Sequence, residues 1–547
     1  MSRPHGVPWL LTWVVLICQT GCCLLDSIGA AESFSHVRPF SNKSNLDQGY
    51  CERKRKTNSF STWSLSSESL IATLPVDTIP ENSIRKVRDC IFSVAYPTPF
   101  ISRVLLVAVS KDVLEGILDL DVSVKETDDF LQLVSGGKVV LGSIPLAHRY
   151  GGHQFGSWAG QLGDGRAHLL GVYTNRYGER WELQLKGSGK TPYSSLVVSN
   201  DDVWRDQFYN GSVKKERGAI VLRVAQSWFR IGSLEILAHS GELDLQRTLL
   251  DFVIQEHFPS VNMNDSNRYL DFFSRVVLET ANLIALWMSV GFAHGVCNTD
   301  NFSLLSITID YGPFGFMESY DPNFVPNTSD DERRYKIGNQ ANVGMFNLNK
   351  LFQALKPVLD RRQKKLAFQI LEGYSQHYYT RFTELFRAKL GLLGENEDDN
   401  YLIAFLLKLM EDTKADFTMA FRHLSEITQD QLKELRIPQE FWALQDLAKH
   451  KFFSDWITIY LLRLGRNMGD SDSTRRKRMT AVNPRYILRN WMAESAIQKA
   501  KMNDFSEVHL LQEVLQHPFQ RQAAAEKAGY SLRPPSWAKD LKVSCSS

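Results

Sequence analysis

Short apolar runs separated by Gly, Pro and Asp turns characterise residues 70–209. The clearest run lies at residues 180–186, where apolar and polar side chains alternate. Successive side chains of a strand point to opposite faces, so this run predicts a strand with one apolar and one polar face. The apolar members are Trp181, Leu183 and Leu185, and the polar members are Glu182, Gln184 and Lys186. We therefore predict a β-rich lobe over residues 70–235.

Helical spacing of apolar residues replaces this alternation from about Asp271 onward. Two segments show the spacing best: Val277, Ala281, Ile284 and Met288, and then Ile403, Leu406, Leu407 and Met410. Apolar residues three and four positions apart lie on one face of a helix. Residues 236–530 are therefore predicted to be mainly helical, and the fold class to be α+β with two lobes.

The two ends of the chain show neither pattern. Residues 8–25 are mostly apolar, with Arg3 before them and the small residues Gly29, Ala30 and Ala31 after them. We interpret residues 1–31 as a cleaved targeting segment, either a secretory signal or an organelle transit peptide. Residues 32–69 are rich in Ser, Asn, Lys and Arg and are predicted to be a flexible tether. Residues 531–547 are assigned to a C-terminal tail.

Composition narrows the class of protein. The 547 residues are 43% hydrophobic and 23% charged, with a formal net charge of +2. This is typical of a globular protein that needs no nucleic acid as partner, and after leader removal we expect no membrane span. One basic run, residues 475–478, is interpreted as a solvated loop or helix face. The seven cysteines form neither a disulfide framework nor a CxxC zinc pattern.

A glycine-rich turn at residues 160–166 leads directly into a predicted strand. Its backbone could approach phosphates closely, although most such turns are plain hairpin connections. The next predicted strand ends in Lys186 after a hairpin turn at residues 175–178. A lysine at the end of a strand after a glycine-rich hairpin is how a kinase fold holds the phosphates of ATP. The alternative is a solvated lysine on an edge strand.

Polar residues gather after the predicted helix around Val277. Asn301 and Asp310 carry the oxygen ligands that Mg²⁺ prefers, and Asp300 is then left as the base that accepts a hydroxyl proton. His294 is interpreted as structural because it lies between an apolar helix and a glycine. Asp310 could also be a simple turn former, but the order of glycine turn, lysine, Asp-Asn and Asp-Tyr-Gly favours a kinase-like site.

Two arginines, Arg223 and Arg230, lie in apolar surroundings between these motifs. Seven residues make two helical turns, so on one helix both guanidinium groups would share a face and could clamp a phosphate. A guanidinium in an apolar run usually serves a buried anion. The alternative is a pair of surface arginines without a partner.

The residue sequences of these motifs resemble those of the selenoprotein O family. The strings that carry the resemblance are Tyr150-Gly-Gly-His-Gln-Phe-Gly, Gly163-Asp-Gly-Arg, Leu185-Lys-Gly-Ser-Gly-Lys-Thr-Pro-Tyr-Ser, Asn298-Thr-Asp-Asn and Asp310-Tyr-Gly-Pro-Phe-Gly-Phe. The similarity extends from about Leu70 to the C-terminus. It implies a kinase-like fold that binds ATP in reversed orientation and transfers AMP with Mg²⁺ to Ser, Thr or Tyr hydroxyls of proteins.

The resemblance also implies individual roles. Matches to nucleotide-binding positions are Gly163, Gly165, Arg166, Lys186, Arg223, Arg230 and Asp310. Asp300 matches the proton acceptor, and Asn301 and Asp310 match the metal ligands. The animal members of the family imply a mitochondrial location, with the secretory pathway as the alternative. The protein substrates and the oligomeric state are left open.

Two departures from the family stand out. After Ser194 the family continues with a helix whose glutamate pairs with the strand lysine, and that helix is missing here, so Glu182 is considered as a substitute. The second departure is Cys545, which stands where animal members carry selenocysteine. We expect nucleotide binding to survive the deletion better than catalysis. The alternatives to AMP transfer are therefore a catalytically impaired nucleotide-binding protein and an ordinary phosphotransferase.

Overall fold

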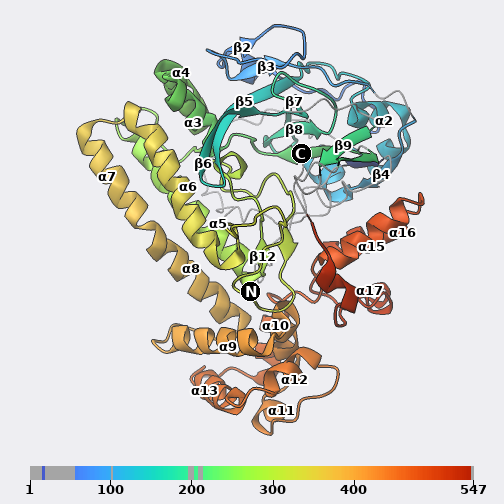
Figure 1. The fold of residues 1–547 in the computed structure, drawn as a ribbon, viewed down its shortest axis with the longest axis vertical. Coiled ribbons are helices and arrows are strands. Elements are labelled where there is room, and N and C mark those ends of the chain that lie inside the picture. Colours follow the sequence, from blue (N-terminus) through green and yellow to red (C-terminus); the bar gives the residue numbers. More distant parts are fainter. Residues whose placement is uncertain are drawn as a thin grey trace, which may run out of the picture.

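The structure is a computed structural model that describes residues 15–18, 56–99, 103–194, 202–206, 213–217, 219–467 and 469–543. Strands predominate before residue 226 and helices after residue 230, as the hydrophobic patterns predict (Figure 1). The fold is α+β with a kinase-like arrangement of two lobes. No helix in the described ranges has the length and apolar character needed to cross a membrane.

The described strands form a nine-stranded sheet with the order β2-β3-β5-β7-β8-β11-β1-β4, in which β6 pairs with β5. All neighbours are antiparallel except β2 and β3. Two small sheets, β9-β10 and β12-β13, lie outside it. The strands are β1 Val15–Cys18, β2 Val76–Asp77, β3 Phe92–Val94, β4 Leu106–Val109, β5 Leu146–Gln154, β6 Ser157–Gly163, β7 Ala167–Thr174, β8 Arg180–Lys186, β9 Asp202–Asp206, β10 Val213–Arg217, β11 Ala219–Ala225, β12 Phe292–Ala293 and β13 Gly315–Phe316.

The helices follow the 3.6-residue spacing read from the sequence. For example, Val277, Ala281 and Ile284 are all buried on one face of α5. The bounds are α1 Glu68–Ile71, α2 Asp128–Ser135, α3 Ile231–Ser240, α4 Leu243–His257, α5 Arg268–Ser289, α6 Gln340–Leu355, α7 Arg361–Glu372, α8 Tyr374–Lys389, α9 Asp399–Thr413, α10 Phe417–Glu426, α11 Gln429–Lys433, α12 Trp442–Ala448, α13 Phe453–Gly465, α14 Asp472–Thr480, α15 Asn490–Ala500, α16 Ser506–Gln516 and α17 Ala523–Lys527.

The alternation in β8 separates two environments. Leu183 and Leu185 are buried in an apolar cluster that also contains residues of α2 and β11. Glu182, Gln184 and Lys186 lie on the opposite face, as predicted, and this face carries the polar site described below. One face of the sheet is therefore core, and the other contributes polar groups to the junction of the lobes.

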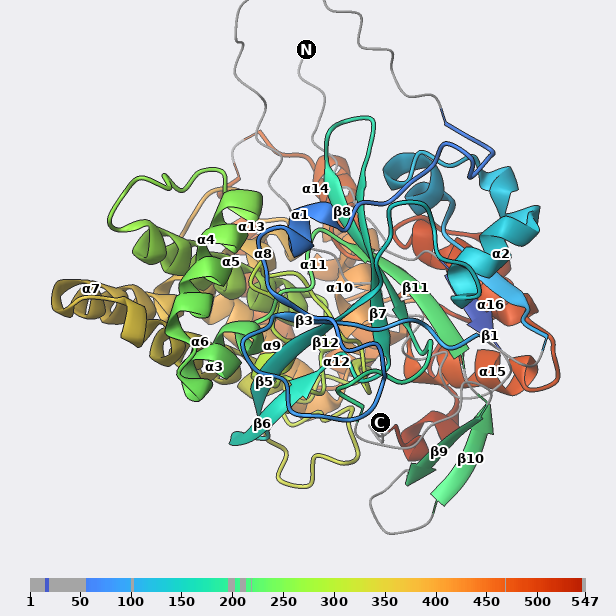
Figure 2. The same cartoon turned by 90° about the horizontal axis from the view of Figure 1, so that it is seen from above.

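The C-terminal helices return to the strand-rich lobe. In Figure 1 the red helices α15 and α16 lie beside β4, and Figure 2 shows α16 near the same end of the sheet. His509 Nε2 lies 2.7 Å from Val107 O, and Gln512 Nε2 donates to Val109 O at 2.8 Å. These side chains satisfy carbonyl groups of an edge strand that would otherwise be open to further pairing.

Two expectations about the non-catalytic segments need correction. The tether predicted for residues 32–69 is part of the fold from Thr57 onward, because Trp63 is buried and donates from Nε1 to Leu118 O at 2.9 Å. Arg475 is also buried, since helix α14 turns it towards the carbonyls of Leu424 and Ile427. Of the predicted targeting segment, only β1 is described, and Cys545 lies outside the described residues.

Candidate active site

Three cationic side chains converge on one carboxylate where the two lobes meet. Asp310 lies 3.3 Å from Lys186 Nζ, 2.7 Å from Arg223 Nη1 and 2.5 Å from Arg230 Nη1. Lys186 ends β8, and Arg223 lies on the neighbouring strand β11, opposite Gln184. Arg230 directly precedes α3. The structure therefore brings together four of the residues that the sequence assigned to the nucleotide site.

The charge around Asp310 is unbalanced. Burial by itself would raise the pKa of Asp310, but Arg223, Arg230 and Lys186 together hold it well below its usual range. Its backbone adopts a left-handed conformation with φ of +53°, which is uncommon for a residue other than glycine and occurs often at functional sites. Asp164 is the second carboxylate in reach of these cations, 3.9 Å from Arg230 Nη2, so three cations face two carboxylates and leave positive charge that a polyphosphate could neutralise.

The two arginines do not share a helix, and this part of the prediction is wrong. Arg223 belongs to strand β11, and Arg230 has an extended backbone with φ −129° and ψ 167° before α3 begins. The guanidinium of Arg223 donates to Gln184 Oε1 at 2.8 and 2.6 Å and lies 4.2 Å above the ring of Trp228. The turn between β11 and α3, and not helical periodicity, brings the arginines together.

Arg230 is held from several sides. Its side chain is 0% exposed and lies 4.3 Å above the ring of Tyr150. Its Nη1 donates to the backbone oxygen of Asp300 at 2.8 Å, and its Nη2 lies 3.9 Å from Asp164 Oδ1. Arg230 thus connects the short helical turn Thr299–Asn301, which contains Asp300, with the glycine turn of the sheet.

Asp164 and Gln184 are site residues that the sequence reasoning did not single out. Asp164 Oδ2 accepts hydrogen bonds from His148 N at 3.2 Å and from Gln184 Nε2 at 3.0 Å. Burial raises the pKa of Asp164 to about 6. The signal for Gln184 was present, because period two places it on the same face as Lys186. Asp164 lies inside the glycine turn, in which the family resemblance assigned roles only to Gly163, Gly165 and Arg166.

The glycine turn is packed beneath residues 191–194. Gly163 has a φ of +155°, and a Cβ atom at this position would lie 2.4 Å from Tyr193 Cγ. Ser194 Oγ contacts Gly165 O, and Gly187 N donates to Arg166 O at 2.8 Å. The absence of side chains on the glycines thus allows the turn, the end of β8 and residues 191–194 to meet.

The predicted base, Asp300, lies in a single helical turn, Thr299–Asn301. Asp300 is 6% exposed, and burial raises its pKa to about 7. Gln154 Nε2 donates to its Oδ2 at 3.1 Å, while Oδ1 is buried and has no hydrogen-bond partner among the described residues. A carboxylate with a pKa near neutral pH is well suited to accept a proton.

Two neighbours of Asp300 in the chain, Asn301 and His294, are also fixed by hydrogen bonds. Asn301 Nδ2 donates to Val296 O at 2.9 Å, which orients the side-chain amide and leaves Oδ1 as its atom for a cation. His294 is fully buried, and its Nε2 lies 3.0 Å from Ile309 O. His294 is therefore a structural residue, as predicted.

Glu182 does not replace the missing helix glutamate. It is buried on β8, where it accepts a hydrogen bond from Trp228 N at 3.0 Å, and burial raises its pKa to about 8. Between Lys186 and β11 the structure describes residues 187–194, β9 and β10, and these include no helix. In the described part of the chain, the acid that pairs with Lys186 is Asp310.

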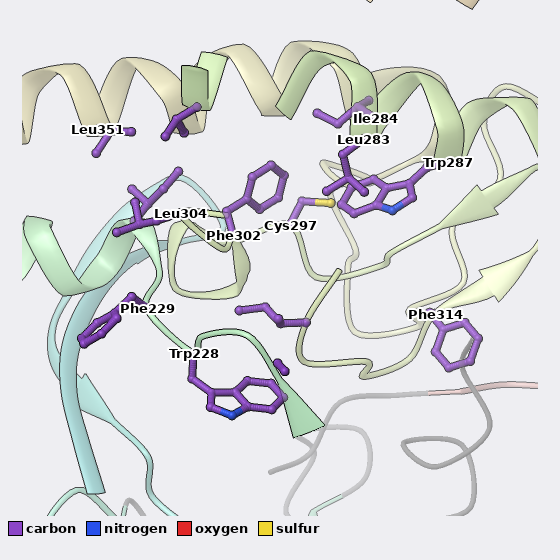
Figure 3. Close-up of a cluster of buried hydrophobic side chains, with 14 of the residues drawn as sticks. Trp228, Phe229, Leu283, Ile284, Trp287, Cys297, Phe302, Leu304, Phe314 and Leu351 are labelled. Atoms are coloured by element: carbon purple, nitrogen blue, oxygen red, sulfur yellow. The ribbon is translucent and has the colours of Figure 1, made fainter. Parts of the chain in front are cut away.

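A hydrophobic cluster packs against the residues that flank the Asp300 turn (Figure 3). Figure 3 shows Leu283, Ile284 and Trp287 on helix α5 beside Cys297 and Phe302, which flank the turn. Trp287 Nε1 also donates to Thr308 Oγ1 at 2.9 Å. The rigid helix thus supports the short segment between Asp300 and Asp310.

A strand-rich lobe and a helical lobe with clustered cations and a buried aspartate at their junction form a kinase-like arrangement. The comparisons with known proteins specify this class further. The family model described as "Protein adenylyltransferase SelO" matches residues 80–196 and 195–516. The chain belongs to this family and is by family a protein nucleotidyltransferase. The two matched segments meet at residues 195–196, which is where the sequence indicates a missing helix.

Curated relatives agree with this assignment. Protein nucleotidyltransferase YdiU of Pseudomonas fluorescens (strain SBW25) is 38% identical over 500 residues, which cover 85% of this chain and 98% of the relative. YdiU of Azoarcus sp. (strain BH72) is 38% identical over 518 residues, with 87% and 98% covered. YdiU of Flavobacterium johnsoniae is 36% identical over 516 residues, with 87% and 97% covered.

Proposed function

We propose that this protein transfers AMP from ATP to Ser, Thr or Tyr hydroxyls of protein substrates. The observation that carries the proposal is the convergence of Lys186, Arg223 and Arg230 on Asp310, next to the turn that holds Asp300. The three cations are suited to bind a polyphosphate, and Asp300 is suited to accept a proton. The adenylyltransferase family of the chain selects AMP transfer among the reactions that such a site could perform.

In the proposed reaction, the oxygen of the acceptor hydroxyl attacks the α-phosphorus of ATP. The bond between the α-phosphorus and the α,β-bridging oxygen breaks, and pyrophosphate leaves. The hydroxyl proton passes to the carboxylate of Asp300. Arg223 and Arg230 would hold the leaving pyrophosphate by charge-assisted hydrogen bonds, which strengthen as negative charge develops on it. The reversed orientation of ATP stays a prediction from the family resemblance.

Mg²⁺ fits the donors that the chain offers. Asn301 Oδ1 and the carboxylate of Asp310 are hard oxygen ligands, and Mg²⁺ is commonly held by one or two carboxylates together with substrate phosphates. No group of three or more His, Cys, Asp or Glu side chains suited to a metal occurs in the ranges that the structure describes. When bound, the ion would neutralise phosphate charge at the reacting phosphorus. It would also take over part of the role that the cations now play at Asp310.

One observation favours a second candidate function, a nucleotide-binding protein without turnover. Lys186 pairs with Asp310, the predicted metal ligand, where a kinase-like site would use a separate glutamate to orient the lysine. If nothing else orients Lys186, ATP would bind but react slowly or not at all. An ordinary phosphotransferase is the remaining alternative. The mitochondrial location stays a prediction from the resemblance.

The test uses the purified full-length chain, Mg²⁺ and ATP labelled at either the α- or the γ-phosphate, with an Asp300→Asn variant as control. We expect label on protein only from α-labelled ATP, and a large loss of it in the variant. Label from γ-labelled ATP would instead establish phosphotransfer. ATP binding without label from either position would establish the non-catalytic alternative.

A further inference from the structure

The end of strand β5 is docked onto the catalytic turn by three successive contacts. His153 N donates to Thr299 Oγ1 at 2.7 Å, and Phe155 N donates to Asn298 Oδ1 at 3.1 Å. Between these two backbone bonds, the side chain of Gln154 reaches Asp300. Three consecutive residues at the end of a strand of the β-rich lobe are therefore hydrogen-bonded to the segment that carries the proposed base.

The side chain of Asp300 is held on two sides by this strand. Gln154 Nε2 donates to Oδ2 at 3.1 Å and is the one side-chain donor to this carboxylate within the described residues. On the other side, a Cβ atom at Gly152 would lie 2.5 Å from Oδ1 and 2.9 Å from Cβ of Asp300. Only glycine therefore leaves the space that Oδ1 occupies, and the carboxylate has little freedom to rotate.

From this geometry we infer that Gln154 is a positioning residue for AMP transfer, with Gly152 as its steric counterpart. Together they hold the Asp300 carboxylate in the orientation in which it accepts the hydroxyl proton. The inference rests on the proposed function, because it concerns the same base. Within the described residues, Gln154 makes no hydrogen bond to Lys186 or to either arginine that pairs with Asp310, so its loss should leave nucleotide binding intact.

The test compares Gln154→Met, which keeps the length of the side chain and removes its donor, with the wild type. Because the variant removes a hydrogen bond to a charged group, kcat should fall by about tenfold or more. The KM for ATP should stay within about twofold, because the lost interaction orients the base and does not hold the phosphates. In an Asp300→Asn background the same substitution should cause no further loss.

Gly152→Ala provides a second variant that acts by a different physical route. Its methyl group should displace the carboxylate and lower kcat with little change in the ATP-induced rise of Tm. The matched control is Gln512→Met, because Gln512 is a half-buried glutamine of α16, outside the proposed site, whose Nε2 donates to Val109 O at 2.8 Å. This control should keep wild-type kcat.

The outcomes separate the inference from the function on which it rests. If the wild type and Gln512→Met both transfer no AMP, the proposed function fails and this inference fails with it. If the wild type is active and Gln154→Met retains its kcat, the inference alone is overturned. It is also overturned if Gln154→Met acts through KM for ATP, or if the loss persists in the Asp300→Asn background.

Discussion

Buried arginines are used in opposite ways in the two lobes. In the helical lobe, Arg463 is neutralised by Asp399 at 2.6 Å and also donates to the backbone oxygen of Leu393. Arg489 is likewise paired with Asp416 at 2.8 Å. At the junction of the lobes, by contrast, three cations all pair with Asp310, and within the described residues the one other carboxylate in reach of them is Asp164, 3.9 Å from Arg230 Nη2.

The difference separates a structural charge from a functional one. A buried arginine with its own carboxylate and additional carbonyl acceptors is satisfied and needs nothing further. Cations that share one carboxylate repel each other, and their mutual repulsion is relieved when an anion arrives. We therefore expect the same residue type to stabilise the fold in one lobe and to prepare a binding site in the other.

The largest effect is expected from breaking a satisfied pair. Arg463→Met removes the cation 2.6 Å from buried Asp399 and, within the described residues, leaves it only Arg387 at 4.0 Å, so the free energy of unfolding should fall by about 3–5 kcal/mol. Denaturant titration with and without ATP measures this loss, and ATP should restore none of it beyond its effect on the wild type. A loss below about 1 kcal/mol would show that this pair behaves like an exposed one.

The next effect concerns the excess charge itself. ATP at about 100 times its Kd should raise the free energy of unfolding of the wild type by about 2.7 kcal/mol. Arg223→Met should remove most of this rise at the same ATP concentration. The matched control is Arg268→Met, which removes a partly exposed arginine paired with Asp251 and should keep the full rise. An equal rise in both variants would contradict a phosphate-binding role for Arg223.

A pH-dependent effect of intermediate size is expected from Glu182. Its pKa is about 8 in the fold, against an ordinary value of 4.5, so between these pH values the folded state binds more protons than the unfolded state. Stability should therefore fall as pH rises through this window. Glu182→Gln should remove the fall and raise stability at pH 8 by on the order of 2 kcal/mol, with little change near pH 4.

Thermal melts of the Glu182→Gln variant and the wild type across this pH range provide the measurement. Gln keeps an oxygen that can accept from Trp228 N, so the variant isolates the charge from the hydrogen bond. Parallel curves for the two proteins would mean that Glu182 titrates normally.

The smallest effect is expected from Lys186→Met without nucleotide. The lysine side chain is 35% exposed, and Asp310 keeps both arginines, so stability should change by less than about 1 kcal/mol. Comparison with Arg463→Met then tests whether cations at the junction contribute less to the fold than the paired cations of the helical lobe. A loss as large as that of Arg463→Met would remove the distinction.

Much of the architecture could be predicted from the sequence because local periodicity reports burial directly. The alternation in β8 and the helical spacing in α5 each predicted both the element and its buried face. The motif strings also singled out Asp300, Asn301 and Asp310, which lie in the segment between α5 and β13. These are statements about neighbouring residues, which sequence patterns can carry.

Other features depend on contacts between residues far apart in the chain. Helical periodicity was the wrong reason for pairing Arg223 with Arg230, because Arg223 lies on strand β11 and Arg230 follows the turn before α3. Composition suggested that residues 57–69 are a tether, but the burial of Trp63 against a distant segment orders them. In the same way, the basic run at residues 475–478 suggested that Arg475 lies in solvent. Its carbonyl acceptors lie some fifty residues earlier in the chain, so the sequence around Arg475 does not reveal that it is buried.

The sequence by itself thus determined the two lobes, the family and the identity of the candidate reacting groups. Only the tertiary structure decided that three cations meet at Asp310. It also decided that Glu182 accepts a hydrogen bond from Trp228 N and that Gln154 donates one to Asp300. The physical reason is that strand and helix periods are local properties of the backbone. The balance of charge at a buried site is instead set by side chains that the folded chain brings within a few ångströms of one another.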